Sequence, residues 1–121
     1  MGRDLVFQGS PGSDQILAGS LTASGTLITI PAGMTFSGDL TVAASSAVAG
    51  TSTVTVSTAG TNVAPAAGVI ARISVTGLLA SAGADSYSTE ILVKAPPENS
   101  VTVTTAISGT GSASLIGWYT S

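Results

Sequence analysis

The chain has 121 residues, enough for one domain, and only 7% of them are charged, against roughly 25% in ordinary soluble domains. The net charge is −3, with three cations, no His and no Cys. Nucleic-acid binding needs clustered Lys and Arg, while catalysis and metal binding most often use His or thiolate groups. We therefore expect no nucleic-acid partner, no enzyme activity, no metal and no cofactor.

Residues 1–20 are expected to form an extended N-terminal arm. The segment MGRDLVFQGSPGSDQILAGS contains scattered apolar residues and a Pro-Gly break, without strand alternation. Residues 5–10 resemble a protease cleavage site of the kind that cloning leaves behind. The match is imperfect, and the three residues before Asp4 are too few for an affinity tag, so we interpret the segment as native.

A large aromatic side chain in such an arm has no obvious place to be buried within the chain. Together with its apolar neighbours it forms a candidate docking element, which could add a strand to a partner's sheet. The partner-binding residues predicted in the arm are Arg3, Leu5, Val6 and Phe7.

From residue 21 onward, apolar and polar residues alternate with a period of two, which predicts half-buried strands. Val, Ile and Thr suit such a pleated surface. Segments rich in Gly, Pro, Asn and Ser separate the runs. The predicted strands are TLITI (26–30), DLTVA (39–43), TSTVTVST (51–58), VIARISVTG (69–77), STEILVKA (88–95), SVTVTTAI (100–107) and SASLIGWYT (112–120).

Short strands that return at close spacing, with no convincing helix between them, indicate an all-β fold. We expect residues 21–121 to form one antiparallel β-sandwich or jelly-roll-like domain, with a small barrel as an alternative. VAASSAVAG (42–50) could be a helical turn or a tight connection. SGTGSAS (108–114) lacks the Lys and the setting of a phosphate-binding loop and predicts a hairpin turn.

The aromatic residues near the C-terminus have two possible roles. Trp118 could anchor the core of the last strand, or Trp118 and Tyr119 could form a subunit interface, because both residue types are enriched in interfaces. A third aromatic, Tyr87, lies near Asp85, which is the pairing of side chains that a sugar site would use. No run of about 20 apolar residues is present, so no membrane span is expected.

Three stretches carry a resemblance to a known class: SGTLITIPAGMTFSGDLTV, APAAGVIARISVTGLLA and APPENSVTVTTAISGTGSASLIGWYT. In their richness in Thr, Ser, Ala and Gly, their low charge and their short Pro-containing turns, they resemble the small β-rich capsid decoration and head-fibre proteins of tailed bacteriophages. The resemblance implies a structural virion protein on the capsid surface, a homotrimer, and attachment to the major capsid protein through the N-terminal arm. The alternative is a fibre-tip module that binds a glycan or a receptor.

Overall fold

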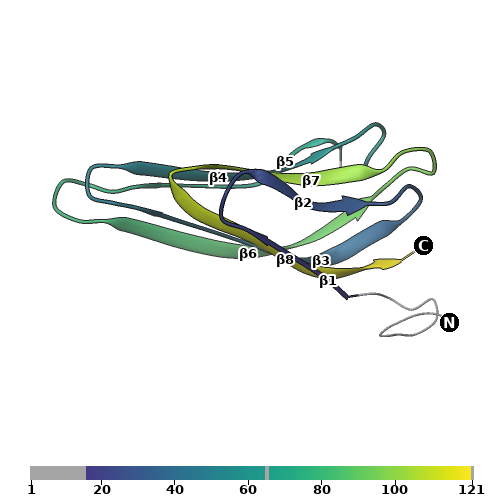
Figure 1. Ribbon diagram of the computed structural model, residues 1–121, viewed down its shortest axis with the longest axis horizontal. Helices are drawn as coiled ribbons and strands as arrows, with labels where there is room; N and C mark the ends of the chain where they lie inside the picture. The colour runs from purple at the N-terminus through teal and green to yellow at the C-terminus, as the bar shows by residue number, and fades with distance from the viewer. Residues whose placement is uncertain (1–15, 65, 121) are drawn as a thin grey trace.

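A computed structural model describes residues 16–64 and 66–120, with side chains from Gly19 onward. The described residues form eight strands and no helix, and the strands make two antiparallel sheets packed face to face (Figure 1). The predicted all-β class and antiparallel sandwich are confirmed. The strands are β1 (Ile16–Leu21), β2 (Gly25–Ile30), β3 (Thr35–Ser46), β4 (Thr51–Ala59), β5 (Gly68–Thr76), β6 (Gly83–Lys94), β7 (Val101–Ser108) and β8 (Thr110–Thr120).

The strand order shows how the chain is wound. Sheet A has the order β1-β8-β3-β6, and sheet B has the order β2-β7-β4-β5. Each strand of the first half pairs with its counterpart in the second half: β1 with β8, β2 with β7, β3 with β6, and β4 with β5. The described chain is thus one long antiparallel double strand, folded at β4–β5, whose successive pairs alternate between the sheets.

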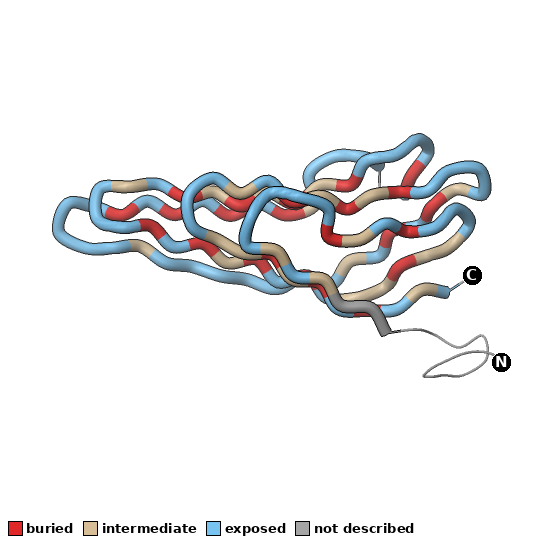
Figure 2. Tube along the Cα trace, viewed as in Figure 1, coloured by how far each residue is buried: buried red, intermediate tan, exposed pale blue. Residues whose placement is uncertain are grey.

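The core lies between the two sheets and is built mainly from valine. Figure 2 shows buried and exposed positions alternating along the strands, as the period of two predicted. Burying one Val, Leu or Phe side chain contributes about 1.5–3 kcal/mol, so this core depends on many modest contributions. The largest fully buried side chains are Phe36, Ile30, Leu40, Leu115, Val42, Val54, Val56, Val93, Val101 and Val103.

Two core hydroxyls have no hydrogen-bond partner among the described residues. Thr58 of β4 and Thr105 of β7 are only 3% and 4% exposed, and neither Oγ1 makes a hydrogen bond. Because an unpaired buried hydroxyl costs about 1–3 kcal/mol, Thr105→Val should raise the free energy of unfolding by about 1 kcal/mol. Urea denaturation measures this change. Thr102→Val, on the outer face of the same strand, is the control and should give no gain; a loss of stability in Thr105→Val would contradict the expectation.

The predicted boundary between arm and domain is wrong, because Ile16–Leu21 belongs to sheet A. This strand pairs with β8 from Ile16 opposite Trp118 to Leu21 opposite Ala113. The sequence of this strand, ILAGSL, contains Ala, Gly and Ser, which hide the alternation of apolar and polar residues that predicted the other strands. Gly19 in particular lies so close to β2 that a Cβ there would be 2.8 Å from the carbonyl oxygen of Leu27.

Two connections between strands test the sequence-based interpretations: the one after β3 decides between two alternatives, and the one between β7 and β8 differs from the prediction. Strand β3 continues to Ser46, and the following turn is closed by the N–H of Gly50, which donates to the carbonyl of Ala47 at 3.0 Å. The tight connection is therefore confirmed, and the helical turn is wrong. Between β7 and β8 the chain crosses from sheet B to sheet A, so the predicted hairpin at residues 108–114 is wrong.

Candidate interaction surface on sheet A

Exposed apolar side chains gather on the outer face of sheet A. Trp118 and Ile116 of β8 are 43% and 54% exposed, and Leu92 of β6 is 61% exposed. Strand β3 lies between β8 and β6, and its Ser37 is directly opposite both Trp118 and Leu92. Residues that are directly opposite, or two apart in one strand, share a face. We call Trp118, Ile116 and Leu92 the sheet A patch.

The patch lies where the arm joins the domain. Ile16, the first residue of β1, is directly opposite Trp118, so residues 1–15 are attached beside the patch. Fifteen residues can span at most about 50 Å. The arm residues predicted to bind a partner, Arg3, Leu5, Val6 and Phe7, lie outside the described residues, and their role stays a prediction.

Charged side chains border the patch. Asp39 of β3 is directly opposite Glu90 of β6 on one side and Ile116 on the other. Like charges directly opposite each other in a sheet are destabilising, and both carboxylates are exposed. Lys94, also exposed, lies two residues beyond Leu92 on the same face. Apolar side chains on β8 and β6 are therefore separated by Ser37 and Asp39 of β3, with acidic groups towards one end of the patch and a cation beyond the other.

Trp118 and Tyr119 point to opposite faces of β8. Tyr119 packs edge-on against Phe36, with ring centroids 5.9 Å apart and planes at 73°. Its hydroxyl donates to the carbonyl of Thr29 on edge strand β2 at 2.7 Å, and burial raises the pKa of Tyr119. Tyr119 thus ties the two sheets together. The interpretation of Trp118 as the core anchor is wrong, and the subunit contact stays a prediction for Trp118 and Tyr119.

Tyr87, the aromatic considered for sugar binding, closes the other side of the sandwich. Its hydroxyl accepts the backbone N–H of Arg72 on edge strand β5 at 3.0 Å and donates to the carbonyl of Arg72 at 3.4 Å. The nearby Asp85 carboxylate accepts the N–H of Ser86 at 2.8 Å. Both polar groups that a sugar site would use are therefore engaged with backbone.

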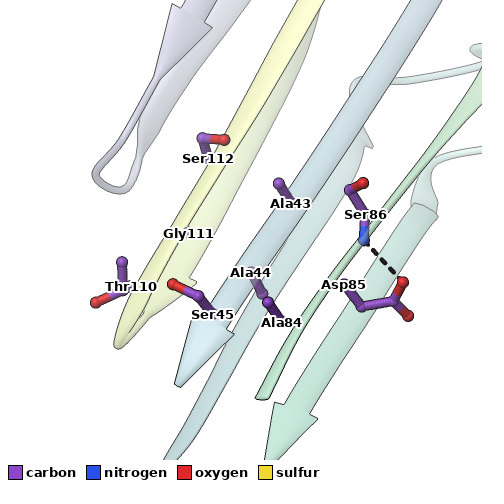
Figure 3. Close-up of a pocket in the computed structure, with 9 residues that line it drawn as sticks. All are labelled: Ala43, Ala44, Ser45, Ala84, Asp85, Ser86, Thr110, Gly111 and Ser112. Carbon is purple, nitrogen blue, oxygen red and sulfur yellow. Dashed lines mark hydrogen bonds between the residues drawn. The ribbon is translucent and has the colours of Figure 1, made fainter. Parts of the chain in front are cut away.

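A shallow hollow of about 720 Å³ lies further along sheet A (Figure 3). Small side chains line it, and Asp85 is its one carboxylate, at the margin and hydrogen-bonded to Ser86. The lining thus offers mainly hydroxyl and methyl groups. Its residues are Ala43, Ala44, Ser45, Ala84, Asp85, Ser86, Thr110, Gly111 and Ser112.

In the part of the chain that the structure describes, no group of three or more His, Cys, Asp or Glu could hold a metal ion. The same residues include no helix long and apolar enough to cross a membrane. Comparisons with protein-family models, with curated proteins and with solved structures find no match.

Sequence reasoning missed two of the three patch residues, although the alternation carried the signal. In STEILVKA, Leu92 falls on the same face as Glu90 and Lys94, opposite the face of Val93, which is a polar face in a half-buried strand. In SLIGWYT, Ile116 and Trp118 share a face by the same rule. A large apolar residue on the charged, solvent-facing side of a strand therefore indicates a contact surface.

Proposed function

We propose that this chain is a structural virion protein, a capsid decoration protein that binds the outer surface of a bacteriophage shell. The observation that carries the proposal is the sheet A patch, with three large exposed apolar side chains at the point where the N-terminal arm begins. Large exposed apolar side chains that gather on one face of a sheet, as Trp118 and Ile116 do along β8, indicate an interaction site. The partner of this site would be the major capsid protein.

The winding of the strands supports the same proposal. We infer a jelly roll from this winding, because four successive antiparallel pairs are folded at β4–β5 and distributed over two sheets. Jelly rolls recur in viral capsid domains. The fold is shared by proteins with many functions, so it raises the expectation of a virion role without defining the site.

The mechanism we propose is cementing. A protein that binds only the assembled shell stabilises that state by mass action. The arm and the patch would act together, because binding through one of them raises the effective concentration of the other at the shell surface. Several copies on one shell would add to this effect. The family resemblance implies a homotrimer, but attachment through the arm and the patch does not depend on the oligomer number.

Binding to purified shells tests the proposal. Deleting residues 2–12 should abolish co-sedimentation with shells built from the major capsid protein, while circular dichroism shows an intact β-domain. Trp118→Ala should weaken binding, because it removes the largest apolar side chain of the patch. Undiminished binding of both variants would rule out attachment through the arm and the patch.

One observation favours the alternative, a fibre-tip module that binds a receptor or glycan. Val48, Leu78 and Leu79 are 46%, 67% and 86% exposed. They lie in the β3–β4 and β5–β6 loops, which are joined by a hydrogen bond from the N–H of Gly77 to the carbonyl of Gly50 at 2.7 Å. Figure 1 shows these loops at the end of the sandwich away from the C-terminus.

The two candidate functions differ in which apolar group matters. If the protein decorates a shell through the patch, Leu79→Ala should leave shell binding unchanged and Trp118→Ala should reduce it. If the far loops bind a receptor, adsorption of the protein to host cells should fall in Leu79→Ala and persist in Trp118→Ala. The pair of variants thus separates the two functions in one set of assays.

A further inference from the structure

Strand β6 is an edge of sheet A, and the direction of its backbone groups can be derived from two hydrogen-bonded positions. The N–H and the carbonyl of Lys94 both bond to Ala64, at 2.6 and 3.2 Å, so both point away from β3. The N–H of Ser86 also points outward, to the Asp85 carboxylate at 2.8 Å. Because direction alternates along an antiparallel strand, the even-numbered residues of β6 direct their backbone groups to the open edge.

The central part of this edge is open among the described residues. Ala64 covers one end, and Asp85 covers the N–H of Ser86 at the other. Between them, the outward backbone groups of Ser88, Glu90 and Leu92 have no backbone partner, since β6 pairs only with β3. The Glu90 carbonyl accepts only the hydroxyl of its neighbour Thr89, at 3.4 Å. The pairing of β6 with β3 runs for 12 residues without a bulge, so the edge is long and regular.

The other edges are each interrupted or short. Strand β1 has six residues. Strand β2 has an irregularity between Thr26 and Ile28, and the carbonyl of its Thr29 accepts the Tyr119 hydroxyl. The pairing of β5 with β4 is also irregular, and Tyr87 occupies both backbone groups of Arg72. Bulges, caps and short length are the ordinary protections of sheet edges. The central part of β6 has no bulge, is not short, and is capped only by the long contact of the Thr89 hydroxyl with the Glu90 carbonyl.

We propose that β6 of one molecule pairs antiparallel with β6 of a second copy about a two-fold axis, which joins two A sheets into one. The charges on the strand select the register. A two-fold centred on Glu90 would set that carboxylate against itself, which is destabilising. A two-fold centred on Ser88 would pair Glu90 with Ser86, whose N–H is already bonded to the Asp85 carboxylate. A two-fold centred on Thr89 avoids both conflicts and keeps the paired residues between the two covered ends.

In this register the cross-strand neighbours within residues 87–91 are compatible. On the outer face, Ser88 lies opposite Glu90 of the second copy. On the inner face, Tyr87 lies opposite Ile91 of the second copy, and Thr89 lies opposite itself. Aromatic with β-branched pairs and Thr–Thr pairs are favourable cross-strand contacts, and Ile91 is only half-buried in the single molecule. The strand is therefore complementary to a second copy of itself.

The inference does not rest on binding to a shell, and it predicts a dimer in place of the homotrimer that the resemblance implies. Sedimentation velocity and native mass spectrometry of the full chain measure the oligomer. Ser88→Pro removes an outward N–H and should leave a monomer with an unchanged circular dichroism spectrum. Ser74→Pro is the matched control on edge strand β5. The two serines are alike, because the hydroxyl of each bonds to a threonine of the neighbouring strand. The distances are 2.8 Å from Ser88 to Thr41 and 3.3 Å from Ser74 to Thr53. The control should remain a dimer.

The register has its own test, which does not use proline. Ser88→Glu would set two carboxylates opposite each other twice per dimer and should weaken the dimer about tenfold or more, whereas Ser88→Lys should tighten it. In the register centred on Ser88, both variants would weaken the dimer. A wild-type chain that is monomeric or trimeric at micromolar concentration would overturn the proposal. So would a dimer that survives Ser88→Pro, or equal effects of the Glu and Lys variants.

Discussion

Phe36→Ala should lower the free energy of unfolding by about 3–5 kcal/mol, which is a large part of the 5–15 kcal/mol that is typical of a whole domain. Phe36 is the largest of the fully buried side chains and has no exposed surface. Its ring supports Tyr119 through an edge-on contact, and Val and Ala make up most of the core. These side chains cannot extend to fill the cavity, so little of the loss is recovered.

Chemical denaturation followed by circular dichroism measures this effect. Phe36→Leu is the control, since it keeps an apolar side chain of intermediate volume and should cost much less. Tyr119→Phe, which removes only the hydroxyl that reaches Thr29, separates the ring contact from the hydrogen bond and should cost about 1 kcal/mol. If Phe36→Ala unfolded at the same denaturant concentration as the wild type, the ring would not be the centre of this core.

The alternation of side chains predicted most of the strands and the face that each one buries. In SVTVTTAI, for example, Val101 and Val103 were expected on one face, and both are fully buried. Alternation describes one strand at a time and carries no information about its neighbours. The pairing of β1 with β8 joins residues about 100 positions apart, such as Ile16 and Trp118. That pairing depends on how both sheets close around the core.

The sheet A patch illustrates the same limit at the level of function. Trp118 was singled out from its residue type alone, and its neighbour Tyr119 was grouped with it although adjacent residues of a strand face opposite sides. Leu92 joins the patch only because β3 places β6 and β8 on its two sides. A surface built from three strands cannot be derived until their order is known.

Gly117→Ala should destabilise the sandwich by about 3 kcal/mol, at the upper end of the cost of inserting one methyl group into a packed interior. Gly117 of β8 is directly opposite Gly38 of β3, and Phe36 packs over both. A Cβ on Gly117 would lie 2.6 Å from the Cα of Gly38 and 2.7 Å from Cζ of Phe36, and it would also meet the carbonyl oxygen of Ser37. Two of these three atoms are backbone, so the strands themselves would have to move apart.

Gly25→Ala is the matched control for this substitution. Gly25 also lies in a strand, and a Cβ there would meet only Cδ1 of Leu21 at 3.6 Å, which is an ordinary contact. Replacing Gly by Ala without a clash restricts the unfolded chain, so Gly25→Ala should leave stability unchanged or slightly raised. Thermal unfolding of the two variants compares them directly. Equal melting temperatures would mean that β3 and β8 separate easily, and the outer face that carries Trp118 and Leu92 would then lack the rigid support that a docking surface needs.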